Sequence, residues 1–258
     1  MVILMPANIF LEVGLNHLGS VDEANKVLNF FIKSKFKYLT FLLHKRSFYN
    51  EQIKKKKNLY LPKSFYIKAL KLAHKKEKKI GLSVCDLSTY NDLSELNFDF
   101  YKILGIAIDN ILLLKKIKTK KKNIYVSLST ANDIKIKNCL KHILVKNKTN
   151  LISTTMSYDP KDFNLSKIKN LKKKYNIPVG YGHHFSNLNP LIMSSFYKPD
   201  FYFFYIKRKN KNKKVIYPDN SHAIFFDDLS DLIKKLDECI IFAKSRSKIN
   251  KIKLKIYG

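Results

Sequence analysis

Eight short apolar runs, rich in β-branched and aromatic residues, alternate along this chain with longer amphipathic stretches, and no other feature restricts its fold as strongly. The strand-like runs cover residues 8–16, 37–43, 79–85, 99–104, 123–129, 150–156, 177–181 and 200–206. The helix-like stretches cover residues 20–34, 62–77, 88–97, 107–118, 131–144, 163–175, 187–197 and 226–245. Apolar strands separated by helices are typical of parallel sheets with crossover connections. Eight such pairs predict an α/β fold, a closed (β/α)8 TIM barrel, rather than an open doubly wound sheet.

The length of the chain agrees with this fold, because one such barrel takes about 250 residues and the chain has 258. We expect a single domain over residues 1–258, since no linker or internal repeat divides the sequence. No GxGxxG follows the first strand-like run, and no GxxxxGK[ST] occurs anywhere. The sequence therefore gives no motif support for a dinucleotide-binding protein or a P-loop protein.

The charge of the chain is strongly positive, with 50 Lys+Arg against 20 Asp+Glu and a formal net charge of +30. Nucleic-acid readers favour arginine for its planar, bidentate fork, yet only Arg46, Arg208 and Arg246 are present here. Lysine, Asn, Ile, Phe and Tyr all have AT-rich codons, so we interpret most lysines as a solvated coat set by genome composition. The lysine runs at 54–57, 120–122, 172–174 and 207–214 fit this interpretation. A nucleic-acid partner is the least favoured alternative and predicts a steep dependence of binding on salt.

The cellular compartment is predicted from cysteines and apolar runs. Cys85, Cys139 and Cys239 are odd in number and far apart, which suits a reduced protein without disulfides. The N-terminal ten residues lack the features of a signal peptide, and no run approaches the length that spans a bilayer. We expect a cytoplasmic protein that does not enter a membrane.

Polar side chains gather at the C-terminal ends of the predicted strands, where (β/α)8 barrels place their functional groups. The candidates are Glu12, Asn16, His17, Lys102, Ser129, Thr130, Tyr158, His183, His184, Lys207 and Arg208. His183 and His184 point to opposite faces of one strand, so at most one of them can be a metal ligand at a single site.

Each candidate also has a purely structural interpretation. Glu12 lies inside a strand, which indicates either function or a buried ion pair. Lys102 can extend to the barrel rim or point inward, where it would suit an anionic ligand or a Schiff base. His17 can close the loop before the first helix, and Ser129 with Thr130 can cap the helix that follows.

Several of these residues belong to ordered motifs. The segments are F-L-E-V-G-L-N-H-L-G-S at 10–20, D-F-Y-K-I at 99–103, L-S-T-A at 128–131, Y-D-P…N-L at 158–165, V-G-Y-G-H-H at 179–184 and Y-P-D at 217–219. In this order they resemble the motifs of the sialic acid (nonulosonic acid, N-acetylneuraminate) synthase family, over about residues 9–235. The resemblance covers the family's catalytic barrel and not its antifreeze-like C-terminal domain.

The resemblance implies a (β/α)8 barrel in surface-carbohydrate biosynthesis. Such enzymes condense phosphoenolpyruvate with an N-acetylated amino sugar, release phosphate by C–O cleavage, and use a divalent metal, Mn²⁺ or Mg²⁺, to polarise the sugar aldehyde. By this resemblance, Glu12 would lie near the metal-bound water, and His184 would bind the metal. Lys102 and Ser129 would bind phosphoenolpyruvate, and Tyr158 and Asp219 would contact the sugar. Asn16, His17 and Thr130 would lie around the site.

The chain departs from the family pattern at several strand ends. Thr40 and Leu42 replace a lysine and a glutamine, Val84 a threonine, Gly105 and Ala107 a serine and a glutamate, and Met156 an asparagine. Lys207 stands where the family has its second metal histidine, and a charged lysine cannot ligate a cation. Lys207 is therefore a candidate for binding substrate in place of the metal.

Two hypotheses follow from the resemblance and its departures. The first is a divergent synthase acting on phosphoenolpyruvate and an amino sugar. The second is a catalytically impaired relative that binds a small anion or a partner synthase and has no tight Mn²⁺ site. Oligomer formation stays open under both hypotheses.

Overall fold

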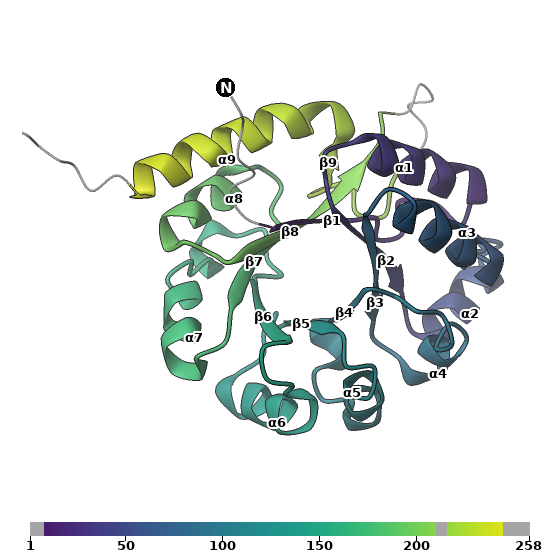
Figure 1. Ribbon diagram of the computed structural model, residues 1–258, viewed down its shortest axis with the longest axis horizontal. Helices are drawn as coiled ribbons and strands as arrows, with labels where there is room; N and C mark the ends of the chain where they lie inside the picture. The colour runs from purple at the N-terminus through teal and green to yellow at the C-terminus, as the bar shows by residue number, and fades with distance from the viewer. Residues whose placement is uncertain (1–7, 210–215, 245–258) are drawn as a thin grey trace, which may run out of the picture.

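The computed structural model describes residues 8–209 and 216–244, and it shows eight parallel strands closed into a barrel (Figure 1). The strands are β1 (Asn8–Glu12), β2 (Tyr38–Leu43), β3 (Lys79–Val84), β4 (Phe100–Ile103), β5 (Asn123–Ser127), β6 (Thr149–Thr154), β7 (Val179–His183) and β8 (Phe201–Lys207). Each strand pairs with the next in sequence, and β8 pairs with β1 through Phe10 and Phe203. The predicted (β/α)8 barrel is confirmed.

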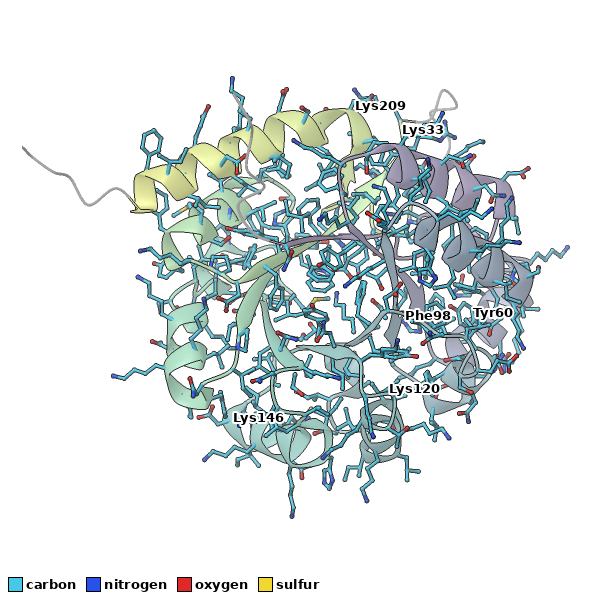
Figure 2. The ribbon with its side chains drawn as sticks, viewed as in Figure 1. Lys33, Tyr60, Phe98, Lys120, Lys146 and Lys209 are labelled. Carbon is cyan, nitrogen blue, oxygen red and sulfur yellow. The ribbon has the colours of Figure 1, made fainter. Side chains whose placement is uncertain are left out.

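The helices form an outer ring around the barrel (Figure 1). They are α1 (Val21–Lys33), α2 (Arg46–Lys54), α3 (Lys63–His74), α4 (Leu87–Asn91), α5 (Ile111–Lys118), α6 (Asp133–Ile143), α7 (Lys167–Tyr175), α8 (Asn189–Ser194) and α9 (Leu229–Lys244). Short 3₁₀ turns are η1 (Gly105–Ala107), η2 (Pro160–Asp162), η3 (Ser195–Tyr197) and η4 (Phe226–Asp228). Among the labelled lysines, Lys33, Lys146 and Lys209 lie in this outer layer, away from the barrel axis (Figure 2).

Three helical segments differ from the sequence-based expectation. The expected helix 88–97 is only the five residues of α4, and 187–197 is divided into α8 and η3. Helix α2 was not predicted; only Tyr49 in it is buried, and most of its residues are polar. Residue 245 of the expected last helix, residues 210–214 of a lysine run and Arg246 lie outside the described residues.

Aromatic side chains fill the N-terminal half of the barrel interior. Phe10 stacks on Phe203 with ring centroids 4.4 Å apart, and Phe100, Tyr125 and Phe201 complete the cluster. Close packing of these rings requires glycine beside them. A Cβ added at Gly81 would lie 2.2 Å from the Phe100 ring, and one at Gly180 would lie 2.1 Å from the Phe201 ring. Among the described residues, the N-terminal half of the barrel interior is therefore filled with aromatic rings, and space for a ligand lies at the C-terminal ends of the strands.

The alternation of side chains along each strand fixes what lies above the aromatic cluster. Two residues after Phe10, Phe100 and Tyr125 come Glu12, Lys102 and Ser127, and two residues after Phe203 comes Tyr205. All four of these polar side chains are buried. The layer above the aromatic cluster is thus polar, which is unusual for a barrel interior filled with apolar side chains.

The chain after β8 turns back over the C-terminal end of the barrel. β9 (Ile224–Phe225) pairs in parallel with the end of β8, through Ile206–Ile224 and Lys207–Phe225. The segment 217–223 before β9 is thereby held beside the ends of β1 and β8. Asn16 fixes it further, since its Nδ2 donates to Ile206 O and its Oδ1 accepts from Asp219 N.

The described residues contain no helix with the length and apolar composition needed to cross a membrane. Cys85 and Cys139 are buried free thiols, and Cys239 is a half-buried free thiol.

Candidate active site

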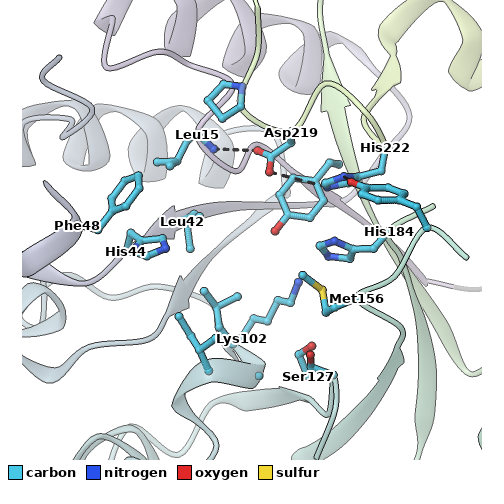
Figure 3. A pocket seen from close by; sticks show the side chains of 17 residues that line it. Leu15, Leu42, His44, Phe48, Lys102, Ser127, Met156, His184, Asp219 and His222 are labelled. Atoms are coloured by element: carbon cyan, nitrogen blue, oxygen red, sulfur yellow. Dashed lines mark hydrogen bonds and ion pairs between the residues drawn. The ribbon is translucent and has the colours of Figure 1, made fainter. Parts of the chain in front are cut away.

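A pocket of about 410 Å³ opens at the C-terminal end of the barrel (Figure 3). Its lining comes from the ends of most strands and from the segment before β9: Leu15, Leu42, His44, Phe48, Lys102, Leu104, Gly105, Ile106, Ser127, Ser129, Met156, Tyr158, His184, Tyr205, Pro218, Asp219 and His222. This is the end of a (β/α)8 barrel where active sites lie. The structure therefore brings Lys102, Ser129, Tyr158, His184 and Asp219 together in one pocket.

A buried ion pair, which we call the floor, lies at this pocket: Lys102 lines the pocket, and its partner Glu12 does not. Lys102 Nζ lies 2.5 Å from Glu12 Oε2, and each side chain is only 3% exposed. Burial raises the pKa of Glu12, and the nearby ammonium of Lys102 counteracts part of that rise. Of the two interpretations of Lys102, the inward one holds. Its charge is balanced by Glu12, so an anionic ligand at Lys102 has to share the ammonium with this carboxylate.

A pair of histidine rings forms one wall of the pocket (Figure 3). The rings of His184 and His222 are stacked with their centroids 4.5 Å apart, and Tyr205 lies edge-on to both. His222 Nδ1 lies 3.1 Å from Tyr158 Oη and 3.2 Å from Ser221 Oγ. Within residues 8–209 and 216–244, His222 Nε2 is buried without a hydrogen-bond partner, and it lies 3.8 Å from Asp219 Oδ1.

Burial sets the protonation of this wall. It lowers the pKa of His222 to about 4 and holds that of His184 well below its ordinary value, so both imidazoles are neutral near pH 7. Burial also raises the pKa of Asp219 to about 6, against the hydrogen bond that its Oδ2 accepts from Leu15 N. The wall thus offers neutral ring nitrogens beside one carboxylate that is mostly ionised at pH 7.

Hydroxyl groups line the side of the pocket next to Lys102. Ser127 Oγ donates to Thr154 Oγ1 at 3.3 Å. Ser129 has a left-handed backbone with φ 44°, and a Cβ added at Gly105 would lie 2.4 Å from the Ser129 Cβ. The glycine that replaces the family's serine therefore makes room for Ser129 at the pocket.

Seven sequence candidates lie outside the pocket lining: Glu12, Asn16, His17, Thr130, His183, Lys207 and Arg208. Glu12 is the buried partner of Lys102, and Arg208 pairs with Glu23 at 3.0 Å. Asn16 holds the segment before β9, as described above, and Thr130 is exposed in the turn before α6. Asn132, and not Ser129 or Thr130, caps α6, because its Oδ1 accepts from Lys135 N. Lys207 Nζ donates to Asn220 O at 2.6 Å and to Asn220 Oδ1 at 3.0 Å, and it lies 4.4 Å from the centre of the Phe225 ring. Lys207 thus fixes the segment before β9.

His17, another of these candidates, is almost fully buried, and its Nδ1 accepts the backbone N–H of Gly19. It closes the loop before α1, which is the structural interpretation given above. His183 is also buried and outside the lining, whereas its neighbour His184 faces the pocket, as the alternation along a strand requires.

We expect His17 to make folding stability depend on pH. Burial lowers its pKa to about 4, whereas an unfolded histidine has a pKa of about 6.5. Between these values the unfolded chain binds more protons, so the free energy of unfolding falls as the pH falls. His17→Gln should reduce the stability lost between pH 7 and pH 5 by about 2 kcal/mol, measured by urea denaturation. His142→Gln, at the barrel surface, is the control, and an unchanged loss in His17→Gln would contradict the assignment.

His222 is the pocket residue that motif reasoning missed. It follows Asp219 by three residues in a segment without a regular element, where no periodicity indicates which side chains face inward. The available signal was its spacing from the Y-P-D motif, because backbone bonds from residues 222 and 223 to Asp219 O fold the segment into one turn. This turn brings His222 to the same side as the Asp219 carboxylate.

The fold and this pocket define a (β/α)8 barrel with a candidate active site at the C-terminal ends of its strands. The model of the NeuB family matches residues 27–196, more than half of the chain. The chain therefore belongs to the NeuB family. An uncharacterized protein of Methanocaldococcus jannaschii is 29% identical over 192 residues, 69% of this chain and 56% of that protein. The chain thus spans only a little more than half the length of this relative.

Solved structures with the same fold include two proteins of carbohydrate metabolism. An N-acetylneuraminic acid (sialic acid) synthetase from Leptospira borgpetersenii, in complex with citrate, aligns with a TM-score of 0.81 over 96% of this chain and 88% of its own, at 21% identity. A spore coat polysaccharide biosynthesis protein from Bacillus subtilis aligns with a TM-score of 0.76 over 91% of this chain and 68% of its own, at 18% identity. At such identities these alignments show a shared fold.

NeuB-family synthases are metal-dependent, which raises the question of whether this pocket suits a cation. Among residues 8–209 and 216–244, no three His, Cys, Asp or Glu side chains are grouped to hold a metal ion. Two neutral imidazoles are available instead, in His184 and His222, and the unpaired, buried Nε2 of His222 is the kind of atom that a metal ion satisfies. Imidazole nitrogens are donors for a divalent transition ion, and two of them would leave its other positions to water or substrate.

Proposed function

We propose that this protein is a cytoplasmic NeuB-type synthase that condenses phosphoenolpyruvate with an N-acetylated amino sugar in surface-carbohydrate biosynthesis. The observation that carries the proposal is one pocket that combines a buried ammonium, Lys102, with two sugar-contacting candidates, Tyr158 and Asp219. A charged group at the floor suits the acid substrate, and the hydroxyl and carboxylate at the mouth suit a polyhydroxy partner.

In this proposal the floor binds the acid substrate. Lys102 and Ser129 hold its carboxylate and phosphate oxygens, where a fixed positive charge and a hydroxyl in a partly dry site bind anions strongly. When the ammonium of Lys102 interacts with the ligand, its ion pair with Glu12 weakens. The carboxylate of Glu12 then becomes the better proton acceptor. We propose that Glu12 then takes the proton of the water that adds to the enol-derived carbon, before the C–O bond to phosphate breaks.

The wall binds the open-chain sugar in the same scheme. Tyr158 and Asp219 position its hydroxyls, so that the aldehyde carbon meets the enol carbon that attacks it. His184 and His222 would hold a divalent ion, which when bound supplies Lewis-acid polarisation of the aldehyde oxygen. Met156, Leu42 and Leu104 contribute apolar surface that limits the water around the reacting groups.

The test is an assay of phosphate release by the purified full chain. Phosphoenolpyruvate is supplied with N-acetylmannosamine or with 2,4-diacetamido sugars, in the presence of Mn²⁺ or Mg²⁺. We expect phosphate release that requires both substrates. Without release with any sugar and either ion, the synthase proposal is wrong.

A second candidate, a non-catalytic anion-binding relative, is favoured by one observation. Thr40, at the position of a family lysine, is buried and hydrogen-bonded to Ser83 at 3.0 Å, so it offers no charge to a phosphate. Calorimetry separates the two candidates. Phosphoenolpyruvate that binds without turnover, together with the lack of a tight Mn²⁺ site, would favour the non-catalytic protein.

A further inference from the structure

A second cavity, of about 650 Å³, lies at the opposite end of the barrel from the candidate active site. It is formed where α5 and α6 end, together with the loops that lead from them into β5 and β6. The two helices pack against each other along the outside of the barrel (Figure 1). None of the residues discussed for the proposed synthase reaction lines this cavity.

Cationic side chains dominate the lining of this cavity. They are Lys115, Lys118, Lys121, Lys141 and Lys148; His142 and Thr119 also line the cavity, and no acidic residue is among the lining residues. Leu144 and Val145 contribute apolar surface to the lining. We call this cavity the lysine cleft.

The ammonium groups of the lysine cleft are largely unpaired. In the part of the chain that the structure describes, the side chains of Lys115, Lys118 and Lys141 have neither an ion pair nor a hydrogen bond. Lysines elsewhere form ion pairs with acidic residues: Lys172 pairs with Asp200 at 2.8 Å, and Lys174 pairs with Asp133. The cleft therefore concentrates positive charge that the protein itself does not neutralise.

The excess of lysine over acidic residues is larger around the cleft than in the chain as a whole. Residues 111–148 contain eleven lysines and a single acidic residue, Asp133, which α7 already neutralises through Lys174. Around the start of α9, by contrast, Asp227, Asp228 and Asp231 lie close together. A lysine-rich genome composition accounts for many lysines, but it does not account for the lack of acids in one segment. Like charges around one concave surface repel each other, and a bound anion removes this cost.

We infer that the lysine cleft binds a compact oligophosphate, a ligand with two or more linked phosphate groups. Lysine serves as a point charge for phosphate, and several lysines around one cavity match several linked negative charges. The cavity volume lies in the range of small-ligand sites. Neither arginine nor any Phe, Tyr or Trp lines the cleft, so the bidentate and stacking contacts that nucleic acids use are missing.

Calorimetric titration of the full chain with tripolyphosphate, pyrophosphate and orthophosphate at physiological ionic strength tests the inference. We expect saturable binding that strengthens from orthophosphate to tripolyphosphate. The triple variant Lys118→Gln/Lys121→Gln/Lys141→Gln should bind tripolyphosphate about tenfold more weakly. Circular dichroism and thermal unfolding confirm that the variant is folded.

The matched control removes the same charge from another helix end. Lys71, Lys75 and Lys76 are exposed at the C-terminal end of α3, and their triple exchange to Gln should leave tripolyphosphate affinity within about twofold. Equal weakening in both triple variants would mean that net charge alone attracts the anion, and the cleft would not be a site. Tighter binding of single-stranded RNA than of tripolyphosphate, lost in the cleft variant, would overturn the inference in favour of a nucleic-acid surface. Phosphate release in the synthase assay does not enter this test.

Discussion

Replacing Lys102 with methionine is expected to lower the free energy of unfolding by about 3–5 kcal/mol at pH 8. Methionine fills much of the same volume, so the loss comes mainly from the charge of Glu12, which stays buried without a partner. Burial already raises the pKa of Glu12, and without the ammonium of Lys102 this pKa rises further. Urea denaturation of the wild type and the variant measures the difference.

The pH dependence of this variant identifies the cause. An acid with a raised pKa in the folded chain binds its proton more readily when folded, so stability improves as the pH falls through that value. The deficit of Lys102→Met should therefore be smaller at pH 5 than at pH 8. The double variant Glu12→Gln/Lys102→Met removes both charges and should recover much of the lost stability. A deficit that is equal at both pH values and in the double variant would point to lost packing instead.

Lys102→Met also separates stability from function. If the proposed role of Lys102 on phosphoenolpyruvate is right, the folded double variant should still lack phosphate release, although its stability has returned. A stable but inactive barrel would show that the floor pair serves the ligand more than the fold.

The barrel could be predicted from the sequence because two independent periodicities agree along the whole chain. Runs such as residues 200–206 are apolar on both faces, which only a strand covered on both sides permits, and the intervening stretches carry one apolar stripe. Helix α2 was not predicted, because its residues are mostly polar and it buries only Tyr49.

The floor of the pocket was equally accessible to sequence reasoning. Glu12 and Lys102 lie on strands, and a charged residue inside an apolar strand has to find a partner or a ligand. The register that brings them together depends on the closed ring of strands, since β1 and β4 are not neighbours in the sheet. Sequence reasoning therefore identified both residues but left open whether they meet.

The wall of the pocket could not be predicted in the same way. Strand alternation placed His184, but the direction of Lys207 depends on Asn220, and the position of His222 depends on the turn after Pro218. Hydrogen bonds inside an irregular segment decide both positions, and such bonds have no periodicity in the sequence. Lys207 and His222 are linked physically, because the ammonium of Lys207 holds the segment that carries His222 into the pocket.

This link leads to the second large effect, on metal binding. We expect His222→Gln to weaken Mn²⁺ binding by about tenfold or more, measured by calorimetry and by the electron paramagnetic resonance of free Mn²⁺. The physical reason is the free Nε2 of His222, which lies beside the ring of His184 and near the Asp219 carboxylate. Tyr158 and Ser221, at Nδ1, are placed to accept the ring N–H of the tautomer whose Nε2 lone pair is free. Glutamine keeps a polar side chain but removes the imidazole donor.

His44→Gln is the matched control, because His44 lines the same pocket on the side away from His184 (Figure 3). Its Mn²⁺ affinity should equal that of the wild type. Equal affinity in His222→Gln would show that the ion, if it binds, does not use this ring. A wild type that binds no Mn²⁺ would mean that His222 does not replace the family's second histidine, whose strand position Lys207 occupies. That result would favour the non-catalytic protein. Retained binding with loss only in His222→Gln would mean that the second histidine donor has moved from strand β8 to the segment that Lys207 holds in place.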